Sequence, residues 1–178
     1  MHEKNYADLL SVRQKILDVG CGRGKFLKKN WIGLDINPRF ANKRIKTGSG
    51  TKIPFKKESF DGVFACNFME HLSYKDNIKF FNETYRVLKP KGLFLVITSC
   101  NLGRRNSFYD NPEHIRPWTH NAFKQLLSDN EIKFNIKNVD YFAGVFPFSH
   151  YLGHKFWDTI ANNLHLNVTA IRILMGKK

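Results

Sequence analysis

The most constraining feature of the sequence is a short apolar segment that runs directly into three closely spaced glycines, KILDVGCGRGKFL at residues 15–27. A short apolar run closed by glycine predicts a buried β-strand. Gly20, Gly22 and Gly24 would permit unusual backbone dihedrals and would leave no side chain to keep a ligand off the backbone. A helix beginning after such a turn offers free amide groups and a positive end. The stretch therefore predicts a site for a ligand that carries an anionic group.

Strand-like and helix-like segments alternate along the chain. Apolar segments that read as strands are residues 15–20, 31–37, 59–67, 91–99, 133–142 and 166–176. Helical spacing, proline positions or capping residues predict helices at residues 6–12, 25–30, 38–46, 74–88 and 119–130, the last with Thr119 as its N-cap. This alternation is typical of an α/β protein with a mostly parallel sheet, in which ligands bind beyond the carboxyl ends of the strands.

Length and composition favour one globular domain in a reducing compartment. The 178 residues are 42% hydrophobic, which is enough for a sizeable core. Cys21, Cys66 and Cys100 lie far apart without a CxxC pair, so we expect neither a disulfide framework nor a metal site. The first 15 residues lack an apolar signal core, and no run approaches the roughly 18 apolar residues of a membrane span. We therefore expect a cytoplasmic protein.

The charge of the chain is strongly positive and unevenly placed. The formal net charge is +14, and residues 23–57 hold eleven Lys or Arg and a single acid, Asp35. Such a stretch would attract phosphates, nucleic acid or an anionic membrane surface. It is equally compatible with a chain that is simply rich in Lys, Asn, Ile and Phe. The charge alone does not separate these interpretations.

Asp35 ends the second predicted strand. A carboxylate is an acceptor-only group that can receive both hydroxyls of a ribose; the alternative is a helix cap or a surface acid. The spacing of the glycines differs from a dinucleotide fingerprint, because Lys25 stands where the third glycine of GxGxxG would lie. A nucleoside ligand other than a dinucleotide is therefore favoured.

Five motifs occur in a familiar order: ILDVGCGRG, GLDINP, IPFKKESFDGVFACNFMEHL, YRVLKPKGLFLVI and NPEHIRPWT. In this order they resemble a class I S-adenosylmethionine-dependent methyltransferase, and within it the type 11 group of small-molecule and glycan methyltransferases. The resemblance covers roughly residues 15–127. It implies a Rossmann-like, doubly wound and mostly parallel sheet of about seven strands, with helices on both faces and an antiparallel strand near the C-terminus.

The resemblance also implies S-adenosyl-L-methionine as the cofactor and a set of residues that bind it. Asp18 and the glycine turn would bind the methionine half, Asp35 the ribose and Ile36 the adenine. Ser49 stands where the family usually has an acid for the adenine amine, so its hydroxyl or a backbone carbonyl must substitute. The cofactor-binding residues implied are Asp18, Gly20, Cys21, Gly22, Gly24, Asp35, Ile36, Ser49, Gly50 and Asn67.

The class of molecule that accepts the methyl group is inferred mainly from motifs that the sequence lacks. Asn67-Phe68-Met69-Glu70 replaces the (N/D)PP(Y/F) motif of enzymes that methylate the amino groups of adenine or glutamine, and no Pro-Cys pair supplies a nucleophile for pyrimidine C5. We expect O-methylation of a small molecule or of a glycan or lipid precursor. His114 and His71 are candidate catalytic residues, although a core or capping role is as well supported for His71 and a structural loop for His114.

Arg104 and Arg116 are candidate contacts to the acceptor, because anionic substrates favour arginine. We expect one domain over residues 1–178, with a cofactor half at about 12–100 and an acceptor-side region at about 101–160. The aromatic residues of 141–160 complete the core or form a membrane-facing or dimer surface. Two alternatives remain: a nucleic-acid (RNA) methyltransferase, favoured by the basic stretch, and a non-catalytic S-adenosylmethionine-binding partner protein.

Overall fold

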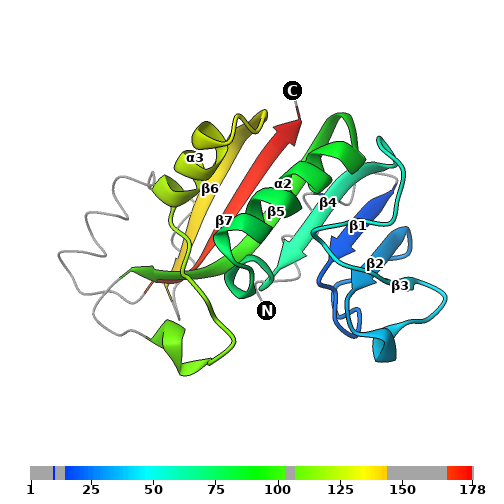
Figure 1. The fold of residues 1–178 in the computed structure, drawn as a ribbon, viewed down its shortest axis with the longest axis horizontal. Helices are drawn as coiled ribbons and strands as arrows, with labels where there is room; N and C mark the ends of the chain where they lie inside the picture. Colours follow the sequence, from blue (N-terminus) through cyan, green and yellow to red (C-terminus); the bar gives the residue numbers. More distant parts are fainter. Residues whose placement is uncertain (1–9, 11–14, 103–106, 144–167, 178) are drawn as a thin grey trace.

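The structure, a computed structural model, describes residue 10 and residues 15–102, 107–143 and 168–177 of the chain. A twisted seven-stranded sheet with the order β3-β2-β1-β4-β5-β7-β6 forms its centre (Figure 1). The strands are β1 (Ile16–Val19), β2 (Trp31–Asp35), β3 (Ile45–Thr47), β4 (Phe60–Cys66), β5 (Leu88–Leu102), β6 (Phe134–Ala143) and β7 (Val168–Lys177).

The first five strands run parallel, and only β7 runs against its neighbours. β1 pairs in parallel with β2 and β4, and the parallel pairing continues outward to β3 and β5. β7 pairs antiparallel with both β5 and β6. The predicted Rossmann-like, mostly parallel sheet with an antiparallel strand near the C-terminus is thus confirmed. The carboxyl ends of β1, β2 and β4 consequently meet at one edge.

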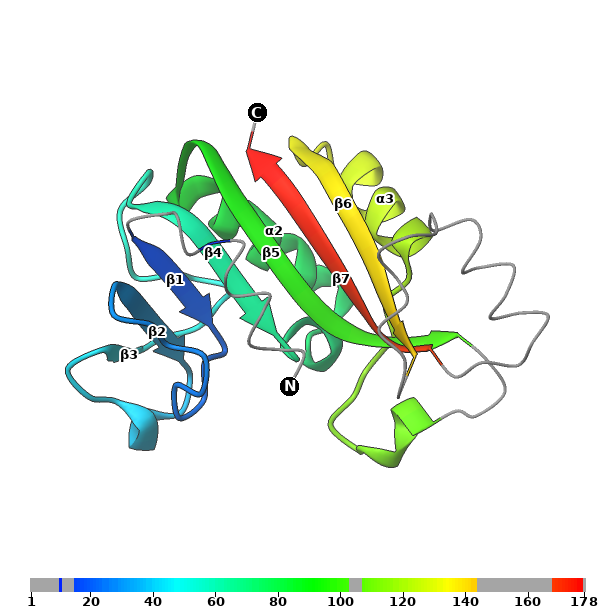
Figure 2. The same cartoon turned by 180° about the vertical axis from the view of Figure 1, so that it is seen from behind.

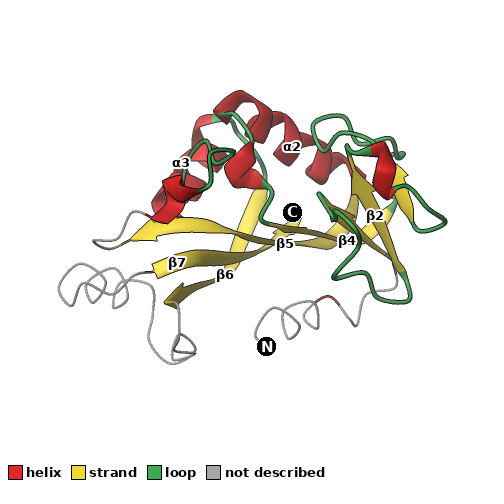
Figure 3. Ribbon diagram, turned by 90° about the horizontal axis from the view of Figure 1, so that it is seen from below, coloured by secondary structure: helices red, strands yellow, loops and turns green. Residues whose placement is uncertain are grey.

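Two α-helices cover one face of this sheet, α2 (Tyr74–Val87) and α3 (His120–Asp129) (Figures 1 and 3). Ser73 caps α2 by accepting a hydrogen bond from the backbone amide of Asp76. Thr119 caps α3 in the same way, as predicted. Between these helices and the sheet lies the main core, where Phe80, Phe81 and Phe94 make edge-to-face contacts.

The opposite face of the sheet is seen in Figure 2. Its buried cluster joins Leu10, Ile16, Trp31, Phe64, Cys66, Leu95 and Ile97. The helix predicted at residues 6–12 lies outside the described residues except for Leu10, which is fully buried in this cluster. The aromatic segment 141–160 lies outside them from residue 144 onward.

Of the two predicted short helices, the one at residues 25–30 is wrong, and the short or irregular helix opened by Pro38 is confirmed only over its first three residues. Residues 25–30 form turns, because residues 20–30 are all that connect β1 to its parallel neighbour β2 and leave no room for a helix and a return. Residues 38–46 form a three-residue 3₁₀ helix, Pro38–Phe40, followed by β3. This helix ends with Ala41 as its C-cap, and the Asn42 side-chain oxygen then accepts hydrogen bonds from the amides of Arg44 and Ile45, which forms a turn before β3.

Candidate functional site

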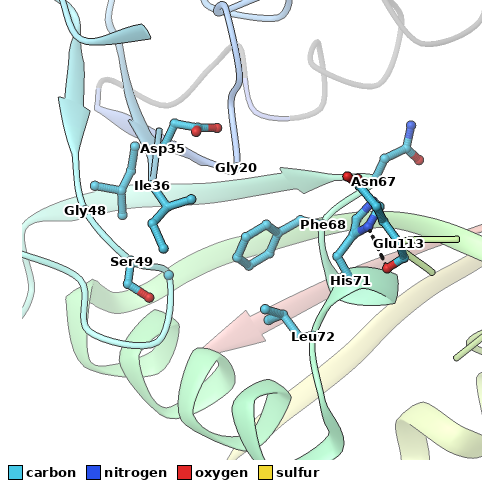
Figure 4. A pocket seen from close by; sticks show the side chains of 12 residues that line it. Gly20, Asp35, Ile36, Gly48, Ser49, Asn67, Phe68, His71, Leu72 and Glu113 are labelled. Atoms are coloured by element: carbon cyan, nitrogen blue, oxygen red, sulfur yellow. Dashed lines mark hydrogen bonds between the residues drawn. The ribbon is translucent and has the colours of Figure 1, made fainter. Parts of the chain in front are cut away.

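A cavity of about 470 Å³ lies at the carboxyl ends of β1, β2 and β4 (Figure 4). It is of the size that small-molecule ligands occupy. Asp35, Ile36 and Ser49 lie on one side of it, His71 and Glu113 on the other, and the Phe68 ring lies between them. Its lining consists of Gly20, Leu34, Asp35, Ile36, Gly48, Ser49, Gly50, Asn67, Phe68, His71, Leu72 and Glu113.

The glycine turn follows β1 and bends tightly over the end of β2. The amides of Gly20 and Cys21 both donate to the Leu34 carbonyl, at 2.8 and 3.2 Å. Gly20 has φ +71°, and a Cβ at this position would lie 2.4 Å from Cδ2 of Phe68. Gly22 has φ +53°, and a Cβ there would meet nothing within 4 Å. The first glycine is therefore required for close packing, and the second leaves open space in front of the backbone.

Asp35 connects the glycine turn to the end of β2. Its Oδ2 accepts a hydrogen bond from the Gly22 amide at 2.8 Å, and its Oδ1 accepts one from the Asn37 amide at 2.9 Å. Each carboxylate oxygen has a second lone pair and can accept another hydrogen bond. The N-cap of the following 3₁₀ helix is Asn37 and not Asp35, and both hydrogen bonds of Asp35 are compatible with the ligand-binding prediction.

Asp18 is a buried carboxyl group on β1. Its side chain is 1% exposed, and its Oδ2 has no hydrogen-bond partner. Burial, and then the negative charge of Asp35, raises the pKa of Asp18 to about 8. At neutral pH this carboxyl group therefore retains its proton in most molecules, and a nearby cation would favour its ionised form.

Cys21 lies in the glycine turn, but its thiol is expected to be unreactive. Burial raises the pKa of its thiol to about 12, with further contributions from Asp18 and Asp35. Because the thiolate is the reactive form, this cysteine is not expected to act as a nucleophile. Gly24 also serves packing, since a Cβ there would lie 2.8 Å from Leu27.

The wall of the cavity that follows β3 is formed by the turn at Gly48–Gly50. Ile36 is 74% exposed beside it and offers an apolar surface to a flat ligand. The Ser49 hydroxyl accepts from the Thr51 amide at 3.1 Å and lies 2.8 Å from the Thr51 hydroxyl. The hydroxyl thus stabilises its own turn, as serine side chains often do.

The outer end of the cavity is formed by the segment after β4 and by the loop before α3. His71 ends the 3₁₀ helix Met69–His71, and its Nδ1 lies 3.2 Å from the Glu113 carbonyl oxygen. His114 lies behind it, with ring centroids 4.9 Å apart, and its Nδ1 lies 2.8 Å from the Phe108 carbonyl oxygen. The structure thus brings the two candidate catalytic histidines together from positions far apart in the sequence.

The other predicted site residues are placed differently. Asp18, Cys21, Gly22, Gly24 and His114 do not line the cavity. The amides of Cys21 and Gly22 donate hydrogen bonds to the lining residues Leu34 and Asp35, and the His114 ring contacts His71.

Arg116 packs over the Trp118 and Tyr74 rings and lines a separate groove beside α3. Arg104 lies outside the described residues.

Sequence reasoning missed several lining residues, among them Phe68, Leu72 and Glu113. Phe68 and Leu72 follow β4 at the ligand-binding edge, so their position along the chain was the available signal. Glu113 reaches the cavity from the loop before α3, and no spacing in the sequence predicts its position.

No described helix is long and apolar enough to cross a membrane.

Comparison with known proteins agrees with this geometry. Residues 17–96 match the model of a methyltransferase domain, Methyltransf_11. The chain is 28% identical over 138 residues to 24-methylenesterol C-methyltransferase 2 of Oryza sativa subsp. japonica, which covers 65% of this chain and 37% of the relative. It is 27% identical over 126 residues to probable tRNA methyltransferase 9B of Homo sapiens, which covers 65% of this chain and 28% of the relative.

The chain therefore spans only about a third of the length of these curated relatives. Among solved structures, a SAM-dependent methyltransferase from Archaeoglobus fulgidus superimposes with a TM-score of 0.77 at 20% identity, over 97% of this chain and 90% of that one. The sheet order, the glycine turn with its acid at the end of β2 and the domain model matched by residues 17–96 together support the resemblance to the type 11 group of the class I S-adenosylmethionine-dependent methyltransferases.

Proposed function

We propose that this protein binds S-adenosyl-L-methionine and transfers its methyl group to an oxygen of a small molecule or of a glycan or lipid precursor. One observation carries the proposal: the glycine turn, the Asp35 carboxylate and the exposed Ile36 side chain all lie around a single cavity of about 470 Å³. This combination suits a nucleoside with a charged amino-acid tail.

The residues of the site fit each part of that cofactor. The unpartnered Oδ2 of Asp18 suits the ammonium group of the methionine half, reached through water or through the glycine turn. Free lone pairs on Asp35 suit the ribose hydroxyls. Ile36 suits one face of the adenine, and because the Ser49 hydroxyl is engaged in its own turn, backbone groups of residues 48–50 would recognise the adenine edge.

Bound there, the cofactor supplies an activated methyl group on a sulfonium. The protein's part is to orient the acceptor, to exclude water and to receive a proton where the acceptor must lose one. His71 lines the outer end of the cavity, on the side opposite Asp35 and Ile36, and His114 contacts His71. Either histidine would accept the proton of an acceptor hydroxyl at Nε2.

Several features favour particular classes of methyl acceptor. The absence of the amino-methylation motif and of a Pro-Cys pair favours oxygen over an amino nitrogen or a pyrimidine carbon. An RNA acceptor is the second candidate, supported by the eleven basic residues between positions 23 and 57 and by the similarity to a probable tRNA methyltransferase. We also propose peripheral membrane contact and oligomerisation. A cytoplasmic location belongs to the same proposal, and the three buried thiols, none of which forms a disulfide among the described residues, favour it.

We further propose that the domain comprises a cofactor half at about 12–100 and an acceptor-side region at about 101–160. The cavity supports this division, because its lining comes from residues 20–72 except for Glu113.

A turnover screen tests the acceptor class. Release of S-adenosylhomocysteine would be measured with sugars, phenols, sterols, nucleotide sugars and RNA, with Asp35→Ala as a matched variant. We expect turnover with a hydroxylated small molecule or precursor. We expect Asp35→Ala to bind the cofactor at least tenfold more weakly, because two hydrogen bonds to a charged acceptor, each worth about 1.5–3 kcal/mol, are lost. Turnover with RNA and with no other acceptor would show that the protein is an RNA methyltransferase. Cofactor binding without any turnover would support a non-catalytic partner protein.

A further inference from the structure

We propose that Glu70, His71 and His114 form a binding site for a divalent metal cation at the outer end of the cavity. No ligand spacing in the sequence predicts it, because His114 lies 43 positions after His71. The catalytic role given to the cation below rests on the proposed methyl transfer, whereas the site itself does not.

The three side chains are already close together. One nitrogen of each ring and one carboxylate oxygen of Glu70 lie within 4.8 Å of one another. A metal about 2.1 Å from each ligand holds neighbouring ligand atoms roughly 3 Å apart, so small side-chain rotations would close the site. Glu70 is fully buried and both histidines are half-buried. Of the three, only His71 lines the cavity, so an ion would enter the site from the cavity past His71.

A backbone hydrogen bond holds together the two segments that contribute the three side chains. Glu70 and His71 belong to the 3₁₀ helix that follows β4, and His114 belongs to the loop before α3. The Ile115 amide donates to the Glu70 carbonyl at 2.7 Å, and this hydrogen bond fixes the residue next to His114 against the residue next to His71. The juxtaposition of the ligands is therefore built into the fold.

Both histidines have the tautomer that metal binding requires. A backbone carbonyl can only accept a hydrogen bond, so each Nδ1 that contacts one must carry a proton: His71 towards Glu113 and His114 towards Phe108. In a neutral ring the remaining nitrogen, Nε2, then has a free lone pair. A second hydrogen bond of this kind from the non-ligating nitrogen is characteristic of metal-binding histidines.

The Glu70 carboxylate is oriented in a comparable way. Its Oε2 accepts from the Thr98 hydroxyl at 2.8 Å, and its Oε1 accepts from the Ser99 hydroxyl at 2.9 Å and from the Ser99 amide at 3.2 Å. Among the described residues, none of the ion pairs formed by a lysine or arginine includes Glu70. A metal cation would neutralise this buried charge.

Two imidazoles and one carboxylate suit borderline cations such as Zn²⁺, Fe²⁺, Mn²⁺ or Co²⁺ and leave coordination positions open towards the cavity. An acceptor hydroxyl bound there would have a lowered pKa and lose its proton to water or to the exposed Glu113 carboxylate. Its oxygen would then form a bond to the methyl carbon as the carbon–sulfur bond breaks, and sulfur would keep the electron pair. In this arrangement His71 and His114 hold the metal and do not themselves take the proton.

Titration with Co²⁺, followed by visible absorption, tests the site on the full chain after removal of metals with a chelator. We expect one Co²⁺ per chain with d–d bands. His71→Ala and His114→Ala should each weaken binding at least tenfold, and Glu70→Gln, which keeps the side-chain shape, should weaken it similarly. Asp110→Asn, which removes an exposed acid from the same loop, should bind Co²⁺ like the wild type. Circular dichroism and S-adenosylhomocysteine affinity would verify that each variant is folded.

The absence of stoichiometric Co²⁺ binding, or equal binding by all the variants, would overturn the metal site. The proposed methyltransferase function would survive that result, because cofactor binding is measured separately in the presence of chelator. Once an acceptor is known, turnover that is unaffected by the chelator would overturn the catalytic role of the cation.

Discussion

Replacing Asp18 by asparagine should make the protein more stable at pH 8 and make it bind S-adenosylhomocysteine more weakly. Asparagine has nearly the same shape but cannot ionise. In the wild type, burial and Asp35 raise the pKa of Asp18 to about 8 from its ordinary value of 3.8. Stability and binding should therefore change in opposite directions, as is common where a functional site contains a strained or unsatisfied group.

The direction of the stability change follows from proton binding. Between about pH 4 and pH 8 the unfolded chain has released the Asp18 proton and the folded chain still holds it, so folding becomes less favourable as the pH rises through this window. Asp18→Asn removes that loss. The full shift corresponds to about 5 kcal/mol at pH 8, but the buried asparagine amide must also lose its contacts with water, which offsets part of it. We therefore expect a gain of about 2 kcal/mol at pH 8, or roughly 4–8 °C in melting temperature for a chain of this size, and no comparable gain near pH 4.

The predicted loss of binding concerns the ammonium group, which S-adenosylhomocysteine shares with the cofactor. Losing a charge-assisted interaction worth about 1.5–3 kcal/mol should raise the dissociation constant roughly 10–100-fold. In the wild type, binding should release a proton below pH 8, which calorimetry in buffers of different ionisation enthalpy detects. A variant that binds like the wild type and is less stable at pH 8 would show that Asp18 is a structural residue only.

The second large effect is expected for His114→Ala. Turnover with the true acceptor should fall by about 10²–10⁴-fold, the usual contribution of a group that removes or stabilises a transferring proton. Cofactor affinity should change less than twofold, because His114 does not line the cavity. Loss of the hydrogen bond to the Phe108 carbonyl should reduce stability by only about 1 kcal/mol.

Steady-state kinetics on His114→Ala distinguish the possible roles. A fall in kcat supports participation in the reaction, either by accepting the proton or by holding a cation, and the Co²⁺ titration separates these two. A rise confined to the acceptor KM would mark a binding contact. If His114→Ala has the kcat and KM of the wild type, the loop that holds His114 has a structural role only. Asp110→Asn, in the same segment, is the matched control.

The sequence was sufficient for the parts of the molecule that local patterns determine. Strands such as Ile16–Val19 and Phe60–Cys66 are short and mostly apolar runs, and both the helical spacing and the Thr119 cap of α3 are local features of the sequence. The glycine turn and Asp35 were predictable because each directly follows a strand. In a parallel sheet, positions directly after strands converge on one edge.

What the sequence did not reveal depends on contacts between distant segments. The strand Ile45–Thr47 is three residues long with one buried side chain, too short for a periodic signal, and only its pairing with β2 defines it. Ser49 carries an ordinary hydroxyl whose engagement with Thr51 becomes visible only in the folded turn. Glu70 and His114 lie close together because the amide of Ile115, in the loop before α3, donates to the carbonyl of Glu70 in the 3₁₀ helix, and no local pattern encodes this contact.

The most direct test of the central claim is calorimetric titration of the purified chain with S-adenosylhomocysteine and, separately, with NAD. The glycine spacing and the arrangement of Gly20, Asp35 and Ile36 around one cavity predict one molecule of S-adenosylhomocysteine bound per chain, with no heat from NAD. Binding of NAD without any response to S-adenosylhomocysteine would contradict the account.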